Sequence, residues 1–426
     1  MDHFQIHDGV MHAEGISLET LAREVGTPFY CYSSATMERH FTVFRDAVAG
    51  LGGNRDGERP PLVAFAVKAN PNLAVLATLA RLGAGADVVS GGELARALAA
   101  GVPADRIVFS GVGKTRAELA AGVEAGILQF NVESEAEIDM LAAVAAARGA
   151  VVEIAIRINP AVDPRTHGKI STGGADAKFG IPWERLPAAF AQAAAHPALR
   201  PVGLAAHIGS QLTDLGPVED AIRKLGSLAS ELEAAGHRMT RIDVGGGLGV
   251  PYRRDMPAPP TPADYAAMVA RATAGWPWRL MFEPGRMIVG NAGVLVSEVI
   301  LTKSGASKHF VVVDAAMNDL LRPSLYGAWH DVLAVRPKTA RTVATVVGPI
   351  CETGDTFAED RDMEDVAAGD LVAFMTAGAY GATMASTYNS RPLVPEVMVN
   401  GDRWAIVSQR NQPAAMLALD AKAPWL

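Results

Sequence analysis

Cysteine is scarce in this sequence, and it contains no long uninterrupted apolar run. The 426 residues include only two cysteines, Cys31 and Cys351, which excludes a disulfide-based scaffold and favours a reducing cytoplasm. Arginine, glutamate or glycine interrupts the alanine-rich segments, so none is long enough to span a bilayer. The first residues have neither a basic region nor an apolar core, and we therefore expect no signal peptide.

Basic residues are also too few and too dispersed to form a nucleic-acid surface. Lysine and arginine number 38, against 46 aspartates and glutamates, and the formal net charge is −8. The two signs are interspersed and no basic face stands out, so we expect no nucleic-acid partner. Hydrophobic residues make up 49% of the chain, which is enough for a large core, and the length predicts more than one domain.

The chain does contain a long alternation of apolar strands and helical segments. Alanine-, leucine- and glutamate-rich segments with helical spacing separate eight short apolar runs, at residues 62–67, 86–89, 107–109, 128–132, 152–158, 203–207, 241–244 and 279–282. Repeated strand–helix units predict parallel strands, and eight of them predict a closed (β/α)8 TIM barrel. We assign residues 34–286 to this barrel.

After Arg286 the sequence becomes rich in strands. Short β-type runs separated by turn signals cover residues 294–301, 308–314, 341–347, 370–375, 396–399 and 403–408. They predict a mostly antiparallel C-terminal β domain over residues 287–426. Near the N-terminus, Asp8-Gly9 between two apolar runs is typical of a hairpin turn. We expect residues 1–33 to pack with the β domain.

Polar residues at the ends of the barrel runs are candidates for an active site, because barrel enzymes act at the carboxyl ends of their strands. Lys68 ends the first run, where a lysine either extends to solvent or is used chemically. Burial would make it a Schiff-base former. Gly245, Gly246 and Gly247 end the seventh run and would let backbone amides approach a phosphate, the alternative being a tight turn without ligand.

Two further rim residues allow several interpretations. Glu283 ends the eighth run and either pairs with a pyridine nitrogen or forms a salt bridge to Arg157 or Arg286. His207 ends the sixth run and is a stacking plate, a proton carrier or a satisfied buried histidine. The residues alone leave these alternatives open.

The β domain contains two candidate residues of its own. Cys351 lies beside Glu352 in a predicted turn, so it is either an acid or nucleophile or a small buried hydrophobe. Cys31 fits the second description better. Arg322 is either a clamp for a carboxylate or a solvated loop arginine.

Several motifs in this order resemble the diaminopimelate decarboxylases, a family of alanine-racemase-like (fold type III) pyridoxal-phosphate enzymes. The resemblance covers nearly the whole chain. It is carried by Ala66-Val67-Lys68-Ala69-Asn70, His207-Ile208-Gly209-Ser210-Gln211, the glycines 245–247, Glu283-Pro284-Gly285-Arg286, Cys351-Glu352-Thr353-Gly354-Asp355 and Gly378-Ala379-Tyr380-Gly381. Related enzymes often have serine at the position of Thr353, which keeps the hydroxyl.

The resemblance implies a role for each matching residue. Lys68, Cys351 and His207 would be catalytic, with Lys68 carrying pyridoxal 5'-phosphate as a Schiff base, His207 stacking on its ring and Cys351 donating a proton. Cofactor binding would involve Lys68, His207, Ser210, Gly246, Gly247, Glu283, Pro284, Gly285, Arg286 and Tyr380. Substrate binding would involve Arg286, Arg322, Tyr326, Glu352 and Tyr380. The family pattern also implies a homodimer in which the loop with Cys351 and Glu352 comes from the partner subunit, and no metal.

The reaction expected from the resemblance is decarboxylation of meso-2,6-diaminopimelate to L-lysine, the last step of lysine biosynthesis. Arg322 suits a distal carboxylate and Glu352 a distal ammonium, which together suit a substrate with an amino acid at each end. Decarboxylases of carboxynorspermidine, ornithine or arginine are alternatives, as are an alanine racemase and a non-catalytic pyridoxal-phosphate-binding regulator. Residues 163–178 form a glycine-containing loop with His167 and Lys169, which is either a lid over the site or an exposed polar loop.

Overall fold

The computed structural model describes residues 2–57, 59–162 and 177–426, which form two compact units. The barrel unit comprises Arg39–Val250 and Ala258–Met287, and the β unit comprises Met1–Glu38, Pro251–Pro257 and Ile288–Leu426. No helix in these described ranges is long and apolar enough to cross a membrane. Almost all of the candidate lid at residues 163–178 lies outside the described residues.

Eight parallel strands close into a barrel, which confirms the predicted fold class. The hydrogen-bonded order is β9-β11-β12-β13-β5-β6-β7-β8, and β8 pairs with β9 to close the ring. All eight predicted runs overlap these strands. Their bounds are β5 (Leu62–Ala66), β6 (Gly85–Val88), β7 (Ile107–Phe109), β8 (Gln129–Val132), β9 (Val152–Asn159), β11 (Leu199–Ala205), β12 (Arg241–Asp243) and β13 (Arg279–Phe282), and the short β10 (Ile181–Pro182) pairs with β9.

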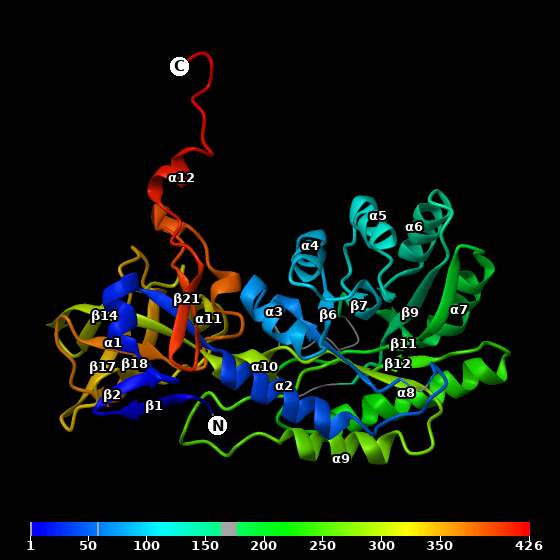
Figure 1. The fold of residues 1–426 in the computed structure, drawn as a ribbon, viewed down its shortest axis with the longest axis horizontal. Coiled ribbons are helices and arrows are strands. Elements are labelled where there is room, and N and C mark those ends of the chain that lie inside the picture. Colours follow the sequence, from blue (N-terminus) through cyan, green and yellow to red (C-terminus); the bar gives the residue numbers. More distant parts are fainter. Residues whose placement is uncertain (1, 58, 163–176) are drawn as a thin grey trace. The chain divides into compact units, whose positions relative to one another are not determined.

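Helices connect the barrel strands, and side-chain caps fix where several of them begin. Ser90 and Ser134 accept hydrogen bonds from backbone amides of the first turn, while Thr115 and Thr261 form capping boxes. Figure 1 shows α4 to α7 following one another beside the strands. The helices are α2 (Ser34–Val48), α3 (Leu73–Arg81), α4 (Gly91–Ala99), α5 (Arg116–Ala125), α6 (Glu135–Ala146), α7 (Leu186–Ala195), α8 (Gly216–Ala234) and α9 (Pro262–Ala272).

The β unit contains a mostly antiparallel sheet, as predicted, and this sheet has nine strands. Its main path is β18-β17-β15-β14-β4-β20-β21, with β19 joining β14 to β16. Within the described residues, β15–β17 and β4–β20 are parallel pairs and the remaining pairs of this sheet are antiparallel. The strands are β4 (Phe29–Ser33), β14 (Gly293–Ser304), β15 (His309–Val313), β16 (Val332–Ala334), β17 (Arg341–Val347), β18 (Thr356–Glu364), β19 (Leu371–Phe374), β20 (Glu396–Asn400) and β21 (Arg403–Ser408).

The N-terminal hairpin belongs to the β unit but forms a sheet of its own. Strands β1 (Phe4–His7), β2 (Val10–Ala13) and β3 (Ile16–Ser17) pair in that order, before helix α1 (Leu18–Val25). Asp8 and Gly9 have φ angles of 50° and 76°, as the predicted two-residue turn requires. Phe4 and Met11 are in one apolar cluster with Val294, and the Met11 amide donates to the Val335 carbonyl over 2.7 Å.

Four strands of the β unit were not predicted, namely β3, β4, β16 and β18. β16 is short, and β18 carries five charged residues among nine, so its alternation is hidden by exposed charges. The backbone of β18 is also irregular, because its register with β17 shifts and Asp360 has a φ of 43°. Three short helices complete the chain: α10 (Arg286–Val289), α11 (Arg322–Tyr326) and α12 (Pro413–Leu417).

Candidate active site

Lys68 lies at the barrel rim, directly after β5, in a buried acidic environment. Its Nζ is 2.8 Å from Asp87 Oδ2, and the Asp87 side chain is fully buried while that of Lys68 is 37% exposed. Asp87 Oδ1 has no hydrogen-bond partner among the residues that the structure describes. The lysine head is therefore held at the rim by a carboxylate from the neighbouring strand β6, and it keeps access to the solvent side.

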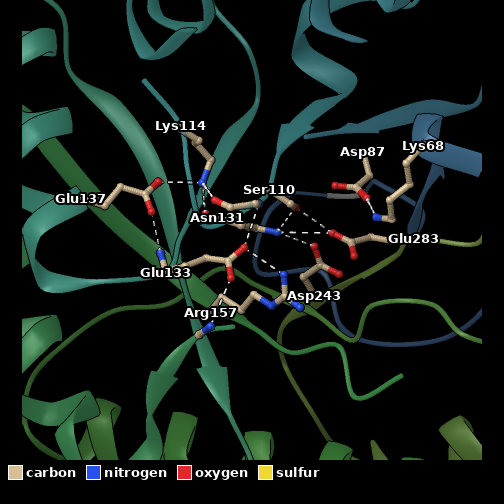
Figure 2. Close-up of polar contacts among 12 residues, drawn as sticks. Lys68, Asp87, Ser110, Lys114, Asn131, Glu133, Glu137, Arg157, Asp243 and Glu283 are labelled. Carbon is tan, nitrogen blue, oxygen red and sulfur yellow. Dashed lines mark hydrogen bonds and ion pairs between the residues drawn. The ribbon is translucent and has the colours of Figure 1, made fainter. Parts of the chain in front are cut away.

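Asn131 connects a group of buried polar side chains in the barrel interior (Figure 2). Its Nδ2 lies 3.2 Å from Asp243 Oδ2, 3.4 Å from Glu283 Oε1 and 3.1 Å from Ser110 Oγ. Ser110 Oγ also lies 3.4 Å from Glu283 Oε1. These residues come from β8, from the ends of β12 and β13, and from the loop after β7, so the closed barrel brings them together.

The two buried carboxyl groups retain protons more readily than exposed ones. Burial raises the pKa of Glu283 well above its ordinary value, the charges of Asp243 and Asp87 add to this, and Lys68 opposes it. Burial also raises the pKa of Asp243, while hydrogen bonds from Glu283, the Gly245 amide and Asn131 oppose the shift. The cluster therefore favours any partner that brings positive charge to Glu283.

His207 is held as a neutral ring beside the glycine loop. The Gly246 amide donates to His207 Nδ1 over 3.2 Å, which leaves the ring proton on Nε2. Burial lowers the pKa of His207 well below 6.5, and the charges of Arg157 and Lys68 lower it further. This arrangement argues against a permanently charged histidine and fits a neutral stacking surface.

The glycine loop after β12 has no room for side chains. A Cβ atom at Gly246 would collide with the Glu283 carbonyl oxygen, and one at Gly247 would collide with the Gly209 carbonyl oxygen. Gly247 also has a φ of 109°. The loop is thus packed against the segments after β11 and β13, where Arg286 Nη2 donates to Ser210 Oγ over 3.1 Å. Hydroxyl, guanidinium and backbone N–H groups in one region are donors that suit a phosphate.

The two arginines considered as salt-bridge partners of Glu283 have contacts elsewhere. Arg157 Nη1 pairs with Glu133 Oε1 over 2.9 Å, and Arg286 binds Ser210. Because Glu283 instead contacts Asn131, Ser110 and Asp243, the geometry favours the pyridine-partner interpretation of Glu283 over a salt bridge.

In the β unit, Arg322 is a buried side chain at the start of α11. Its Nη1 lies 2.9 Å from His330 Nε2, and its guanidinium carbon lies 4.6 Å from the centre of the Tyr252 ring. Only 6% of Arg322 is exposed, which excludes the solvated-loop interpretation. Tyr326 is the last residue of the same helix.

Cys351 and Glu352 occupy an exposed turn that Asp355 holds in shape. Asp355 accepts hydrogen bonds from the Ile350 and Met317 amides over 2.7 and 2.6 Å. Glu352 Oε1 accepts a hydrogen bond from Tyr388 Oη. Cys351 is exposed, which excludes the buried-hydrophobe interpretation for this residue, whereas Cys31 is buried, as predicted.

The predicted site residues thus fall into two sets, one in each unit. Those of the barrel unit all follow the carboxyl ends of β5, β11, β12 and β13, and they are Lys68, His207, Ser210, Gly246, Gly247, Glu283, Pro284, Gly285 and Arg286. Those of the β unit are Arg322, Tyr326, Cys351, Glu352 and Tyr380. Tyr380 has a φ of 56°, a strained conformation for an aromatic residue that is typical of functional positions.

Sequence reasoning missed the polar residues that lie inside strands. Asp87, Asn131 and Asp243 are buried in β6, β8 and β12 and contact or influence Lys68 and Glu283. A polar residue within a short apolar strand of a closed barrel is the signal that could have identified them. His330 gave no such signal. Within the described residues, no group of three histidine, cysteine or acidic side chains is arranged to hold a metal ion.

Comparison with known proteins gives one consistent family. Residues 35–290 match the family "Pyridoxal-dependent decarboxylase, pyridoxal binding domain". The chain is 50% identical to a diaminopimelate decarboxylase of Zymomonas mobilis over 423 residues, 99% of each chain. It is 47% identical to that of Vibrio cholerae over 427 residues, 100% of each chain. The crystal structure of the M. jannaschii diaminopimelate decarboxylase with L-lysine superposes with a TM-score of 0.94 at 36% identity, covering 100% of this chain and 99% of that one.

Proposed function

The chain belongs to the diaminopimelate decarboxylase family, and we infer from this membership that it converts meso-2,6-diaminopimelate to L-lysine and carbon dioxide. It is a pyridoxal 5'-phosphate-dependent carboxy-lyase. The observation that supports this most directly is the position of Lys68 at the barrel rim, 2.8 Å from Asp87 and within the electrostatic influence of Glu283.

The residues of the barrel rim fit the cofactor. When bound, pyridoxal phosphate supplies an electron-accepting ring for the electron pair left as the carboxylate departs as carbon dioxide. We propose that Lys68 holds the cofactor covalently through Nζ and that Glu283 faces its ring nitrogen. The phosphate and its surroundings would be bound by Ser210, Gly246, Gly247, Pro284, Gly285 and Arg286, with Tyr380 contributed by the β unit.

The protein's own groups prepare this site for a positively charged ring. Glu283, Asp243 and Asp87 together favour a cation, because burial raises the pKa of Glu283 and Asp243 and the Asp87 carboxylate is fully buried beside Lys68. The neutral ring of His207 can stack on such a ring without charge repulsion. Asp87 keeps Lys68 Nζ at the rim, where this amine would hold the cofactor and remain accessible to the substrate.

We propose that Cys351 Sγ donates the proton to the carbon that has lost its carboxylate. The thiol is exposed in its turn and therefore accessible. A tyrosine would be expected at the proton-transfer position in a racemase of this fold, so Cys351 favours a decarboxylase. Since the thiol must stay reduced, a reducing compartment such as the cytoplasm suits this role.

The distal end of the substrate determines which decarboxylase this is. Arg322, buried in the β unit, would bind the distal carboxylate, while Glu352 would bind the distal ammonium. Arg286, Tyr326 and Tyr380 would complete the substrate site. A decarboxylase of ornithine or arginine has no distal carboxylate to bind, so the buried cation of Arg322 favours diaminopimelate.

We further propose that the active form is a homodimer in which Cys351 and Glu352 act together with Lys68 of the partner. The basis is the family resemblance of the Cys351–Glu352 turn. Its exposure in the single chain leaves the thiol and the carboxylate accessible to a second subunit.

Product identification tests the function. Purified protein with pyridoxal phosphate should release carbon dioxide from meso-diaminopimelate and form L-lysine in equal amounts, detected by chiral chromatography. Ornithine, arginine and carboxynorspermidine should give little product, and Lys68→Ala should give none. Comparable turnover of ornithine would contradict the substrate assignment, and absence of carbon dioxide release would contradict the activity.

A further inference from the structure

His330 is a buried histidine whose two ring nitrogens are both engaged. It lies between α11 and β16 and is only 1% exposed. Its Nδ1 lies 2.8 Å from the Met375 carbonyl oxygen, and its Nε2 lies 2.9 Å from Arg322 Nη1. The Arg361 guanidinium donates to the His330 carbonyl over 2.9 Å, so both the backbone and the ring are fixed.

These contacts determine the protonation state of the ring. A carbonyl oxygen only accepts hydrogen bonds, so the proton must be on Nδ1. A guanidinium only donates, so Nε2 must offer its lone pair to Arg322. His330 is therefore neutral, with its proton on Nδ1, in this arrangement.

The contact with His330 orients Arg322 without adding a negative charge next to it. The Tyr252 ring lies under the guanidinium at 4.6 Å and meets the His330 ring edge-on, with centroids 5.4 Å apart. These two contacts are both with uncharged rings. A carboxylate in place of His330 would also orient Arg322, but it would neutralise the cation and compete with any carboxylate ligand.

We propose that His330 is a positioning residue that holds the Arg322 guanidinium, through a neutral acceptor, in the orientation that binds the substrate's distal carboxylate. This inference rests on the proposed function, in which Arg322 binds that carboxylate. L-Lysine retains the distal carboxylate after the reaction. Cadaverine has both amines of lysine but no carboxylate, so only lysine should depend on His330.

Three substitutions separate orientation from charge. His330→Gln keeps a neutral acceptor, His330→Glu has nearly the same size but brings a negative charge, and His330→Phe fills the space without an acceptor. Each holoenzyme is compared with wild type and with Arg322→Gln. The measurements are kcat and KM for meso-diaminopimelate, inhibition constants of L-lysine and cadaverine, and thermal unfolding to verify folding.

We expect His330→Phe and His330→Glu to raise the KM of diaminopimelate and the inhibition constant of lysine by about tenfold to a hundredfold, the usual value of one hydrogen bond to a charged group. The effect on kcat should be smaller. His330→Gln should stay within about threefold of wild type, because one neutral acceptor replaces another. The inhibition constant of cadaverine should not change in any of the three.

Three results would overturn the proposal. The first is that His330→Phe and His330→Glu leave the inhibition constant of lysine unchanged while Arg322→Gln raises it. This result would leave the proposed function intact. Another is equal weakening of lysine and cadaverine, which would make the role of His330 merely structural. The third is a loss in His330→Gln as large as in His330→Phe. If Arg322→Gln itself left lysine inhibition unchanged, the substrate assignment of Arg322 would fail instead.

Discussion

At the scale of single residues, the barrel rim is unusual in how much acid it buries beside one lysine. Glu93, in the first turn of α4, adds to Asp87, Asp243 and Glu283. Burial raises the pKa of Glu93 to about 7, opposed by a hydrogen bond from the Val89 amide, with the charge of Asp87 adding to the rise and that of Lys68 opposing it. A carboxyl group that titrates near neutral pH makes the stability of this region depend on pH.

Replacing Glu93 by glutamine should flatten that dependence. Because the pKa of Glu93 is about 7 in the folded protein and its ordinary value is 4.5, the folded state binds more protons than the unfolded state between these pH values. Stability therefore falls as pH rises through this window. Ionisation of the partly exposed Glu93 should lower the free energy of unfolding by about 1 to 3 kcal/mol, and Glu93→Gln should remove this loss.

Urea unfolding of the cofactor-free protein at several pH values between 5 and 8 would measure this change. Wild type and Glu93→Gln should converge near pH 5 and diverge by pH 8, with the variant the more stable. Parallel curves for the two proteins would show that Glu93 does not titrate in this window.

Residues at strand ends could be predicted from the sequence, and residues acting through others could not. Lys68 and Glu283 were identified because a charged residue that ends an apolar run has few ordinary uses. Asp87 was not, because its burial depends on which face of β6 points inward. His330 became visible only through its contacts with Arg322 and Met375, which are 8 and 45 residues away in sequence.

At the scale of elements, the loop after β12 shows how a turn can be determined by its neighbours. Gly246 packs against the backbone of the segment after β13, and its amide donates to His207. The sequence could predict a glycine turn here. It could not predict that the need for glycine comes from the Glu283 carbonyl, which closure of the barrel brings within collision distance of a Cβ atom.

Gly246→Ala should therefore displace the rim. The added methyl group meets backbone rather than a flexible side chain, so the cost should be about 1 to 3 kcal/mol of stability, with cofactor affinity reduced about tenfold or more. Gly113→Ala is a matched control, since Gly113 also lies in a loop after a barrel strand and its Cβ would meet nothing within 4 Å.

Fluorescence titration with pyridoxal phosphate and urea unfolding would measure the two effects. The control should stay within about 0.5 kcal/mol of wild type. Equal cofactor affinity in both variants would contradict the idea that close packing of this loop supports the cofactor site.

Strands were predicted correctly where both faces of the strand are buried and the sequence is therefore rich in apolar residues. The eight barrel strands are buried because helices cover them, and the mostly apolar runs located all of them. In the β unit, β18 is interrupted by exposed charges and by the irregularity at Asp360, so alternation gave too weak a signal. The capping residues Ser90, Thr115 and Ser134 fix where α4 to α6 begin.

At the scale of the whole molecule, the proposed chemistry divides between the two units. The barrel unit carries the residues assigned to the cofactor except Tyr380, and the β unit carries Tyr380, Arg322, Cys351 and Glu352. The C-terminal segment extends from the strands of the β unit (Figure 1). Leu419, Trp425 and Leu426 in this segment are 87%, 83% and 90% exposed. The sequence pattern of one chain is the same whether Cys351 acts with Lys68 of its own chain or with Lys68 of a partner chain.

Pairing two inactive variants would decide this point. Lys68→Ala lacks the cofactor link and Cys351→Ala lacks the proton donor, so each homodimer should be nearly inactive. If the site is shared, a dimer of one Lys68→Ala and one Cys351→Ala chain has one site with both defects and one with neither. Such heterodimers, co-expressed with two tags and purified on both, should show about half of the wild-type activity per dimer. If each chain instead uses its own cysteine, every site carries one defect, and heterodimers verified by mass spectrometry would be as inactive as the homodimers.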